Sequence, residues 1–348
     1  MEGQLDPKVS IIISVHNGGE FFKPSIQSLL SQTVNDFELL IMDDGSTDGS
    51  GNVALSFKDE RIRLFRQEQT GLSKSMNRLI EYSRADLMAR ADADDVYMPD
   101  RIEKQIGIFD GHPDVGVVGT FYEKIDEQGR KSGIEFLPTS HSEMLRYLRL
   151  EPPFAHPVTM IRKSALMKVG GYNEDMQFAQ DYDLWTRLAA VAKFANIPEI
   201  LFQYRTQSSS ASMLSRKKQI SFHRNARRTY WQSLPVEKLD EHRWKEELYE
   251  TIDIEFSAVE KHGKTKQQSK AEIAKRRIYE ANLAYGAKRP DIGMRCLFEA
   301  AQLSRDIKYF TAYSSAKVLG FQKAWAIARS ILFGKIKKAV RDNPLLEW

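Results

Sequence analysis

Short apolar runs alternate with amphipathic stretches over the first two hundred residues of the chain. Apolar runs of strand length predict strands at residues 8–15, 37–44, 62–67, 86–92 and 115–126. Apolar residues at helical spacing predict helices at residues 21–32 and 72–84. Strands that alternate with helices pair in parallel through right-handed crossovers. The pattern therefore predicts an α/β fold with an open, mostly parallel twisted sheet and flanking helices.

The hydrophobic pattern changes along the rest of the chain, where helical spacing dominates and β-branched runs almost disappear. We therefore expect an α/β domain at residues 1–215 and an α-helical C-terminal region at residues 216–348. In the second region, residues 323–341 place Trp325 and Phe333 on one helical face and include six basic and no acidic residues. Such a helix is suited to docking on an anionic membrane surface. The alternative is a C-terminal helix that packs on the domain.

Composition and charge narrow the class of protein. The net charge of the 348 residues is +4, which is too low to indicate nucleic-acid binding. The single cysteine, Cys296, has no partner for an intramolecular disulfide and favours a reducing compartment. We find no signal peptide and no run of about 18 apolar residues that predicts a membrane span. The expected location is cytoplasmic, with peripheral association on the inner face of the membrane.

Three aspartates, Asp92, Asp94 and Asp95, lie within four positions at the end of the predicted strand at 86–92. Alternation along a strand lets Asp92 and Asp94 point the same way. Carboxylates this close repel one another unless a positive group lies among them, and Mg²⁺ or Mn²⁺ prefers such oxygen ligands. The alternative is that the three side chains only cap the following turn. Arg90 either balances the charge of this cluster or forms a structural ion pair.

A second acidic pair, Asp43 and Asp44, ends another predicted strand. Ligands gather at the carboxyl ends of parallel strands, so the two acidic groups are expected to face the same crevice. The residues that follow the pair, Ser46, Thr47 and Asp48, are typical turn and helix-cap residues.

Four segments in order resemble family 2 glycosyltransferases, which have the GT-A fold. Residues 9–50 resemble the start of that family, and residues 90–101 resemble its Asp-x-Asp motif. Residues 154–166 and 170–189 resemble its acceptor-side segments. The resemblance covers residues 8–212, and several ordered motifs are more specific than any one of them. It implies a GT-A-type sheet, followed by a helical region that the resemblance does not cover.

The sequence departs from the family pattern at three places. The first strand of the family usually ends in Pro-x-Tyr-Asn, whereas here Val15 and His16 precede a matching Asn17. Gln180 stands where the family often has a glutamate before its catalytic aspartate. Gln207 replaces the usual histidine of the segment that closes over the donor, which puts a histidine contact to metal or phosphate there in doubt.

The resemblance implies a nucleotide and metal site. It makes Asp94 the direct metal ligand, and it places Asp92, also a metal candidate, near the ribose or a bound water. Asp44 is implied to accept a hydrogen bond from uracil or another base, because an ionised carboxylate is an acceptor only. Asn17 lines the same nucleotide pocket. Arg205, a fork-shaped donor, is implied to contact the diphosphate.

The resemblance also implies an acceptor side. Asp181 matches the general base that deprotonates the acceptor hydroxyl in an inverting transfer. Asp183 is the second candidate for this side, and His156 is a candidate for the acceptor pocket. The alternative for both aspartates is structural, because they begin a helical run and aspartate suits the first turn of a helix. Both readings of Asp181 are compatible.

Together these residues imply an inverting glycosyltransferase that depends on Mn²⁺ or Mg²⁺. The expected reaction moves a sugar from a nucleotide-sugar, expected to be a UDP-sugar, to a hydroxyl of a glycan or lipid-linked acceptor in cell-surface polysaccharide synthesis. Two alternatives stay open, a sugar nucleotidyltransferase and a non-catalytic binding or scaffold homologue. The first has no use for a base at Asp181. The second is disfavoured by four retained carboxylates, Asp44, Asp92, Asp94 and Asp181.

Overall fold

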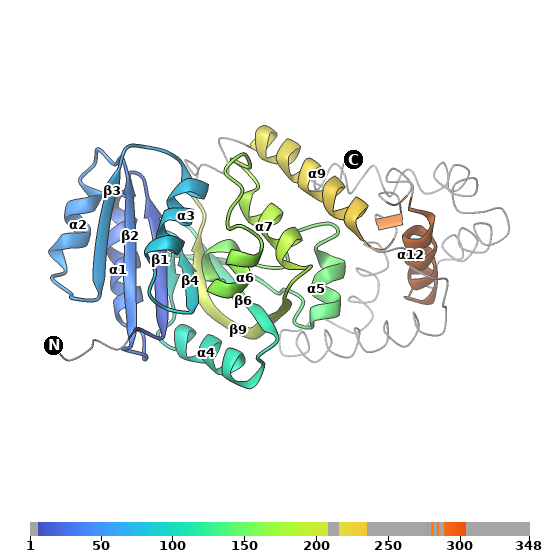
Figure 1. Ribbon diagram of the computed structural model, residues 1–348, viewed down its shortest axis with the longest axis horizontal. Coiled ribbons are helices and arrows are strands. Elements are labelled where there is room, and N and C mark those ends of the chain that lie inside the picture. The colour runs from blue at the N-terminus through green and yellow to red at the C-terminus, as the bar shows by residue number, and fades with distance from the viewer. Residues whose placement is uncertain are drawn as a thin grey trace. The chain divides into compact units, whose positions relative to one another are not determined.

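The computed structural model describes residues 6–207, 216–234, 277, 280, 281, 284 and 289–303. Met1–Leu145 with Pro152–Phe222 forms one compact unit, and Arg146–Glu151 with His223–Trp348 forms a second. The described part of the first unit is built on one nine-stranded sheet with helices around it (Figure 1). The predicted fold class, α/β with flanking helices, is confirmed.

The first half of the sheet is parallel, as the alternating pattern predicts. Its strands run side by side in the order β3 (Ile62–Gln67), β2 (Phe37–Asp44), β1 (Val9–Val15) and β4 (Leu87–Ala91). The chain crosses between them through η1 (Gly19–Phe21), α1 (Phe22–Leu30), α2 (Ser50–Ser56) and α3 (Leu72–Tyr82). The predicted strands and helices of this half are all present, because each carries its own apolar run.

The second half of the sheet is mixed. It contains β5 (Val96–Tyr97), β6 (Val115–Ile125), β7 (Lys131–Glu135), β8 (Met160–Arg162) and β9 (Lys193–Arg205). β8 lies between β4 and β6 and is antiparallel to both, whereas β9 is parallel to β6. Parallel pairing therefore extends less far than the pattern predicts. Sequence reasoning missed β8, which has only three residues, and β9, whose register with β6 shifts beside Pro198.

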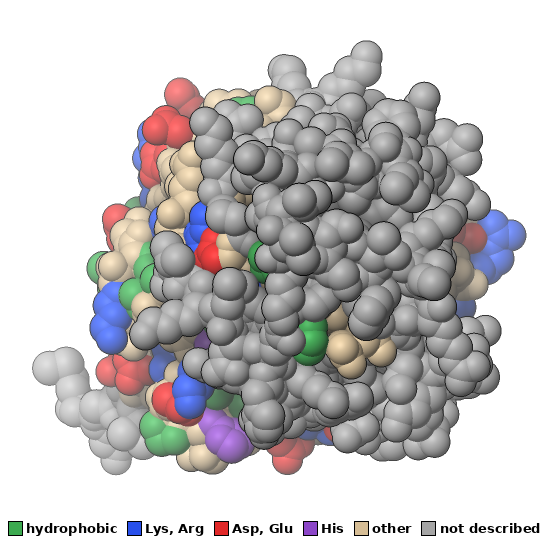
Figure 2. Space-filling model, turned by 90° about the vertical axis from the view of Figure 1, so that its right-hand side faces the viewer, with side chains coloured by type: hydrophobic (Ala, Val, Ile, Leu, Met, Phe, Trp, Pro, Cys, Tyr) green, Lys and Arg blue, Asp and Glu red, His purple; other side chains and the backbone are tan. Residues whose placement is uncertain are grey.

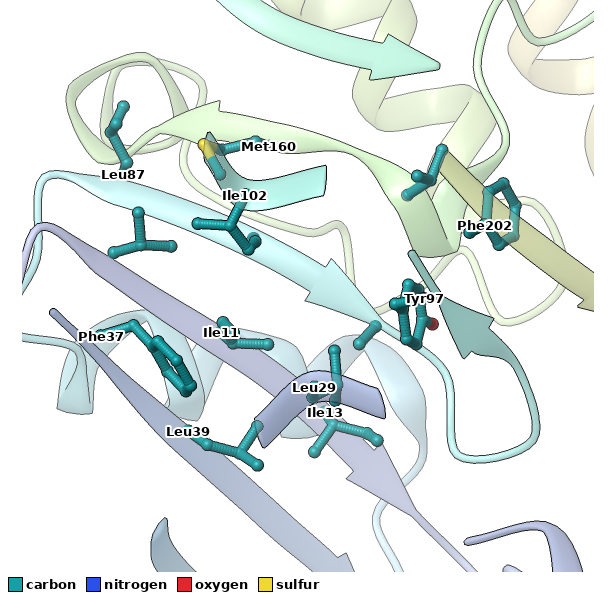
Figure 3. Packing of buried hydrophobic residues seen from close by; sticks show 14 of the residues in the cluster. Ile11, Ile13, Leu29, Phe37, Leu39, Leu87, Tyr97, Ile102, Met160 and Phe202 are labelled. Atoms are coloured by element: carbon teal, nitrogen blue, oxygen red, sulfur yellow. The ribbon is translucent and has the colours of Figure 1, made fainter. Parts of the chain in front are cut away.

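A hydrophobic core covers one face of the parallel strands. Figure 3 shows Ile11 and Ile13 of β1 and Leu39 of β2, which belong to the same buried cluster as Leu29 of α1. Ile102, from α4 (Arg101–Gly111), belongs to it as well. Burial of each such side chain contributes about 1.5–3 kcal/mol relative to exposure. The core therefore anchors α1 and α4 to the sheet beneath the loops at its carboxyl edge.

Short helical segments fill the chain between β7 and β9. They are α5 (His141–Tyr147), η2 (His156–Val158), α6 (Lys163–Lys168) and α7 (Gln180–Leu188). Two of them carry residues of the predicted acceptor side, since His156 begins η2 and Asp181 lies in the first turn of α7.

The described residues beyond 215 are helical, as the pattern predicts. They form α9 (Arg216–Ser233) and much of α12 (Pro290–Leu303). In the second unit, buried Glu299 forms an ion pair with Arg277, whose Nε lies 2.6 Å from Oε2, and its Oε1 accepts from Arg295 Nε at 2.8 Å. The predicted amphipathic helix at 323–341 lies outside the described residues. No helix in the described part of the chain is both long and apolar enough to cross a bilayer.

The described surface carries both signs of charge. Acidic and basic side chains are intermixed among the described groups visible in Figure 2. The large apolar side chains that the described residues expose come from separate elements of the sequence, namely Leu55, Tyr82, Ile134, Met167 and Val191.

A buried carboxylate braces the end of the sheet where β1 and β2 begin. Glu38 lies opposite Ser10 in the β1–β2 register and accepts from its hydroxyl at 2.6 Å. Arg84 donates its backbone N–H at 2.7 Å and its Nε at 2.9 Å, and Arg63 donates Nη1 at 2.5 Å. Burial alone raises the pKa of Glu38, but these hydrogen bonds outweigh it and the pKa lies below its ordinary 4.5.

Glu38→Gln should therefore lower the free energy of unfolding at pH 7 by about 1–3 kcal/mol, because charge-assisted hydrogen bonds are lost. A lowered folded pKa stabilises fully above the ordinary value and is lost as the pH falls through the folded value. The difference between wild type and variant should shrink below about pH 4.5 in denaturant titrations. Glu81→Gln, at an exposed position, is the control and should change stability by less than about 0.5 kcal/mol. A pH-independent difference would contradict this account.

Candidate active site

The candidate site lies at the carboxyl edge of the parallel strands. β1, β2 and β4 are adjacent and parallel, and Val15 pairs with Asp43 at the ends of the first two. The loops that follow these strands therefore leave the sheet on the same side. They carry Asn17, Asp44 and the acidic segment that begins at Asp92.

The loops after β1 and β2 are locked together. Asn17 has a left-handed backbone with φ of 55°, a conformation that asparagine tolerates better than most residues. Its N–H donates to Ser46 Oγ at 3.0 Å, and its Oδ1 accepts from the Thr47 N–H at 2.8 Å. Asp48 accepts from the Gly19 N–H at 2.9 Å. Asn17 thus connects the two loops, and the turn residues serve the structural role expected of them.

Asp44 is 3% exposed and is held as an ionised acceptor. Its Oδ1 accepts from Gln67 Nε2 at 2.6 Å and from the Thr70 N–H at 2.8 Å, and its Oδ2 accepts from the Gly71 N–H at 2.8 Å. Burial raises the pKa of Asp44, but these hydrogen bonds outweigh it and leave the pKa below its ordinary value. Asp44, the residue predicted to contact the nucleobase, is therefore a carboxylate whose Oδ2 accepts fewer hydrogen bonds than its Oδ1.

The three crowded aspartates lie in a bend between β4 and β5. Because β4 ends at Ala91, strand alternation does not orient Asp92 and Asp94, contrary to the argument from sequence. Hydrogen bonds to Ser25 of α1 and Tyr97 of β5 hold the bend instead. Ser25 Oγ donates to the Asp92 carbonyl at 2.8 Å, and the Asp92 N–H donates to the Tyr97 hydroxyl oxygen at 2.6 Å.

Arginines supply positive charge next to this bend. Arg90 is 1% exposed, and its Nη2 lies 2.5 Å from Asp92 Oδ1. Arg205 donates its backbone N–H to Asp95 Oδ1 at 2.8 Å and its Nε to the Asp94 carbonyl at 2.9 Å. The ion pair expected as one reading of Arg90 is present, and it also offsets charge within the cluster.

Arg205 has only part of its guanidinium left for a ligand. Besides Nε, its Nη1 donates to the Asp126 carbonyl at 3.0 Å, and the group lies 4.5 Å from the Phe21 ring centre. Its Nη2 makes no hydrogen bond within the described part of the chain. The predicted diphosphate contact would have to come from this nitrogen.

The carboxyl groups of Asp94 and Asp95 are nevertheless incompletely compensated. Burial, followed by the charge of Asp92, raises the pKa of Asp94 to about 6, although Gln207 Nε2 donates to its Oδ2 at 2.6 Å. Burial, followed by the charges of Asp92 and Asp94, raises the pKa of Asp95 well above its ordinary value. A cation in this bend would relieve that repulsion.

The acidic bend fits a divalent cation shared with another ligand. Asp92 Oδ1 is taken by Arg90 and Asp94 Oδ2 by Gln207, so the second oxygen of each accepts nothing from another described residue. No three His, Cys, Asp or Glu side chains group into a metal site among the residues that the structure describes. Two carboxylates with phosphate oxygens is a donor set that Mg²⁺ and Mn²⁺ commonly take.

Asp181 and Asp183 occupy different environments on α7. Asp181 is half-buried, and its Oδ1 accepts from the Tyr182 N–H at 2.8 Å. Asp183 is 8% exposed, and its Oδ2 lies 2.8 Å from Arg187 Nε and 2.7 Å from Arg187 Nη2. Arg187 also donates Nη1 to the carbonyl of Gly171 at 2.8 Å. Asp183 is therefore engaged in a structural ion pair, whereas Asp181 forms none with the residues that the structure describes.

His156 contacts a buried tyrosine, Tyr172. Its Nε2 is 2.8 Å from the Tyr172 hydroxyl, and burial, together with the nearby Arg90 charge, lowers its pKa well below the ordinary value. His156 is thus a neutral imidazole. Burial raises the pKa of Tyr172, and the charges of Asp181 and Asp92 raise it further. One buried hydroxyl therefore lies within electrostatic range of both carboxylates.

Sequence reasoning missed Gln32, which follows α1 and supports the start of α4. Gln32 Nε2 donates to the Met98 carbonyl at 2.9 Å, and its Oε1 accepts from the Ile102 N–H at 3.1 Å. Ile102 is in the first turn of α4, where backbone N–H groups have no partner inside the helix. Gln32 therefore caps α4 from a distant segment, and no spacing within the sequence marks it for that role.

The chain is similar in sequence to known glycosyltransferases. The family model for glycosyl transferase family 2 matches residues 10–170. The amylovoran biosynthesis glycosyltransferase AmsE of Erwinia amylovora is 30% identical over 205 residues, which are 57% of this chain and 76% of AmsE. The O-antigen biosynthesis glycosyltransferase WbnJ of Escherichia coli is 31% identical over 214 residues, which are 58% of this chain and 81% of WbnJ.

A solved structure extends the likeness to most of the chain. S. aureus TarS in complex with UDP-GlcNAc superposes with a TM-score of 0.55 at 16% identity, covering 90% of this chain and 92% of that chain. At this identity the likeness shows the fold alone. It confirms the expected GT-A-like architecture.

Gln32→Leu should leave the Ile102 N–H without its acceptor and remove one of the two hydrogen bonds to the Met98 carbonyl, which costs about 1–3 kcal/mol of unfolding free energy. Hydrogen exchange at the Ile102 amide should accelerate, because its acceptor is removed. Gln27→Leu, at an exposed position of α1 shortly before Gln32, should change neither measurement. Equal exchange at Ile102 in wild type and Gln32→Leu would show that Gln32 does not cap α4.

Proposed function

The chain belongs to glycosyl transferase family 2 and is a glycosyltransferase, and from this premise we propose its reaction. The proposed reaction is an inverting, metal-dependent transfer from a nucleotide-sugar, specifically a UDP-sugar, to a hydroxyl of a glycan or lipid-linked acceptor. The observation that carries the proposal is the placement of Asn17, Asp44 and the acidic bend at one carboxyl edge of adjacent parallel strands. Asp181 lies near enough to this edge that its charge and that of Asp92 both raise the pKa of the buried Tyr172 hydroxyl. Donor-binding and base chemistry need carboxylates placed together in this way.

The donor side of the proposal rests on the loops after β1, β2 and β4. Asp44, kept ionised by its hydrogen bonds, would accept the N–H of the base, and Asn17 would line the same pocket. Asp92 and Asp94 would hold Mn²⁺ or Mg²⁺ through the oxygens that the protein leaves free. That ion, when bound, would neutralise the charge that builds on the departing diphosphate. The free Nη2 of Arg205 would add a donor to the same phosphates.

The acceptor side of the proposal rests on α7 and η2. Asp181, in the first turn of α7, would take the proton of the acceptor hydroxyl. Asp183 is a weaker candidate for the base, because its ion pair with Arg187 already engages it. Neutral His156, hydrogen-bonded to Tyr172, would form a wall of the acceptor pocket without carrying charge into it.

Names of relatives suggest the biological setting. AmsE is named for amylovoran biosynthesis and WbnJ for O-antigen biosynthesis, and TarS was solved with UDP-GlcNAc. These names support cell-surface polysaccharide synthesis and a UDP-sugar for this chain. A catalytic domain at residues 1–215 and docking of the predicted helix at 323–341 on an anionic inner membrane face complete the proposal. Family membership removes the nucleotidyltransferase alternative, and the four clustered carboxylates disfavour a scaffold.

A panel of nucleotide-sugars tests the proposed function. Wild-type protein with an acceptor extract and Mn²⁺ should release nucleoside diphosphate from a UDP-sugar, and omission of the metal should abolish release.

Asp94→Ala should lose metal-dependent UDP binding in calorimetry, because one of two carboxylate ligands is gone. Release that survives chelation, or unchanged metal-dependent affinity in the variant, would overturn the metal assignment.

Asp181→Asn should lower transfer by about 10²-fold or more while UDP affinity stays near that of wild type, since it removes basicity and keeps shape. The matched variant two positions on, Asp183→Asn, should lower thermal stability through loss of the Arg187 ion pair and retain most transfer. Single-turnover rates with saturating donor separate the two effects. A greater loss of transfer in Asp183→Asn than in Asp181→Asn would reverse the assignment of the base.

A further inference from the structure

Consecutive backbone positions at the end of β9 are tied first to the acidic bend and then to the end of β6. The Arg205 N–H donates to Asp95 Oδ1 at 2.8 Å, and the Thr206 N–H donates to the Ile125 carbonyl at 2.8 Å. The backbone before Gln207 is therefore held on both sides, by the bend and by the end of β6. This brings the Gln207 side chain to the bend from a fixed starting point.

Gln207 donates its amide to a single oxygen of the bend. Nε2 lies 2.6 Å from Asp94 Oδ2, and the two residues are 113 positions apart in the chain. An ionised carboxylate is an acceptor only, so the amide presents its N–H to Asp94 and turns its carbonyl oxygen elsewhere. An N–H donor cannot ligate a cation, so at this contact the amide orients the carboxylate instead of competing for the ion.

Asp92 is held in the corresponding way from below the bend. Arg90 Nη2 contacts Asp92 Oδ1, so each of the two carboxylates has one oxygen held by a side-chain donor and a second oxygen that no other residue in the described part of the chain contacts through a hydrogen bond. Partners that bind a metal ligand in this way fix its direction, and their removal typically lowers metal affinity 10- to 100-fold. Of the two partners, Gln207 is the more tractable, because Arg90 is almost completely buried.

We propose that Gln207 is a positioning residue for the metal site: its amide holds Asp94 Oδ2 so that Oδ1 alone faces the cation. The inference rests on the proposed function, which assigns the cation to Asp94 and Asp92. It adds a residue from the end of β9 to a site otherwise built from the loop after β4. The affinity of the bend for the cation therefore depends on the position of Gln207, two residues after the end of β9.

The test compares two glutamine-to-leucine variants, one in β9 and one two residues after its end. Gln207→Leu removes the donor and keeps the side-chain size. Gln203→Leu is matched to it, because Gln203 Nε2 also donates to a carboxylate, Glu123 Oε2 at 2.9 Å, outside the acidic bend. Mn²⁺ affinity is measured in the presence of UDP by electron paramagnetic resonance of the free ion, and UDP affinity without metal is measured by calorimetry.

Gln207→Leu should weaken Mn²⁺ binding about 10- to 100-fold and leave metal-free UDP affinity within about threefold of wild type. Gln203→Leu should change neither. Equal Mn²⁺ affinity in Gln207→Leu and wild type would overturn the inference alone, and tighter binding would show that Gln207 competes with the ion. Absence of UDP-dependent Mn²⁺ binding in wild type would overturn the inference together with the proposed metal site.

Discussion

Compensation of three crowded carboxylates by buried arginine is the interaction on which the candidate site depends. Asp92, Asp94 and Asp95 share a short bend, and Arg90 is buried beneath it with its guanidinium on Asp92. Removing one partner of a buried ion pair commonly costs about 3–5 kcal/mol. The bend therefore keeps its shape only where β4 supplies Arg90 and β9 supplies Arg205, two strands that the sheet order separates by β8 and β6.

The compensation is incomplete, and this is where stability and function diverge. Arg205 contacts the bend through its backbone N–H and through a backbone carbonyl, so it does not pair directly with the carboxylate of Asp94. Burial, followed by the charge of Asp92, raises the pKa of Asp94 to about 6, and the Arg205 charge only partly opposes that rise. A protein optimised for stability alone would replace such a group, whereas functional sites commonly retain local violations that the remaining structure tolerates. The residual negative charge is the feature that a cation and a diphosphate would use together.

The two halves of the sheet contribute different chemistry to one edge. The parallel half carries Asn17 and Asp44 on interlocked loops, and their hydrogen bonds fix an ionised acceptor. The mixed half and its short helices bring Asp181, together with the residues that follow β9. Asp181 and Asp183 are only two positions apart, yet residues at this spacing on a helix face different directions. One therefore meets Arg187, and the other is left for the candidate site.

The sequence by itself determined the parallel half of the sheet, the helical character of the described C-terminal segments, and the strand ends that carry Asp44 and Asp92. These are local signals, because the periodicity of hydrophobic residues and the acidic residues at strand ends can be recognised within a few consecutive residues. Only the tertiary structure decided that β8 enters the sheet antiparallel, that Gln32 caps α4, and that Gln207 holds Asp94. Gln32 and Ile102 are 70 positions apart, and Gln207 and Asp94 are 113 apart. Contacts of that separation depend on which strands become neighbours, and the short apolar content of β8 leaves no periodic pattern from which that order follows.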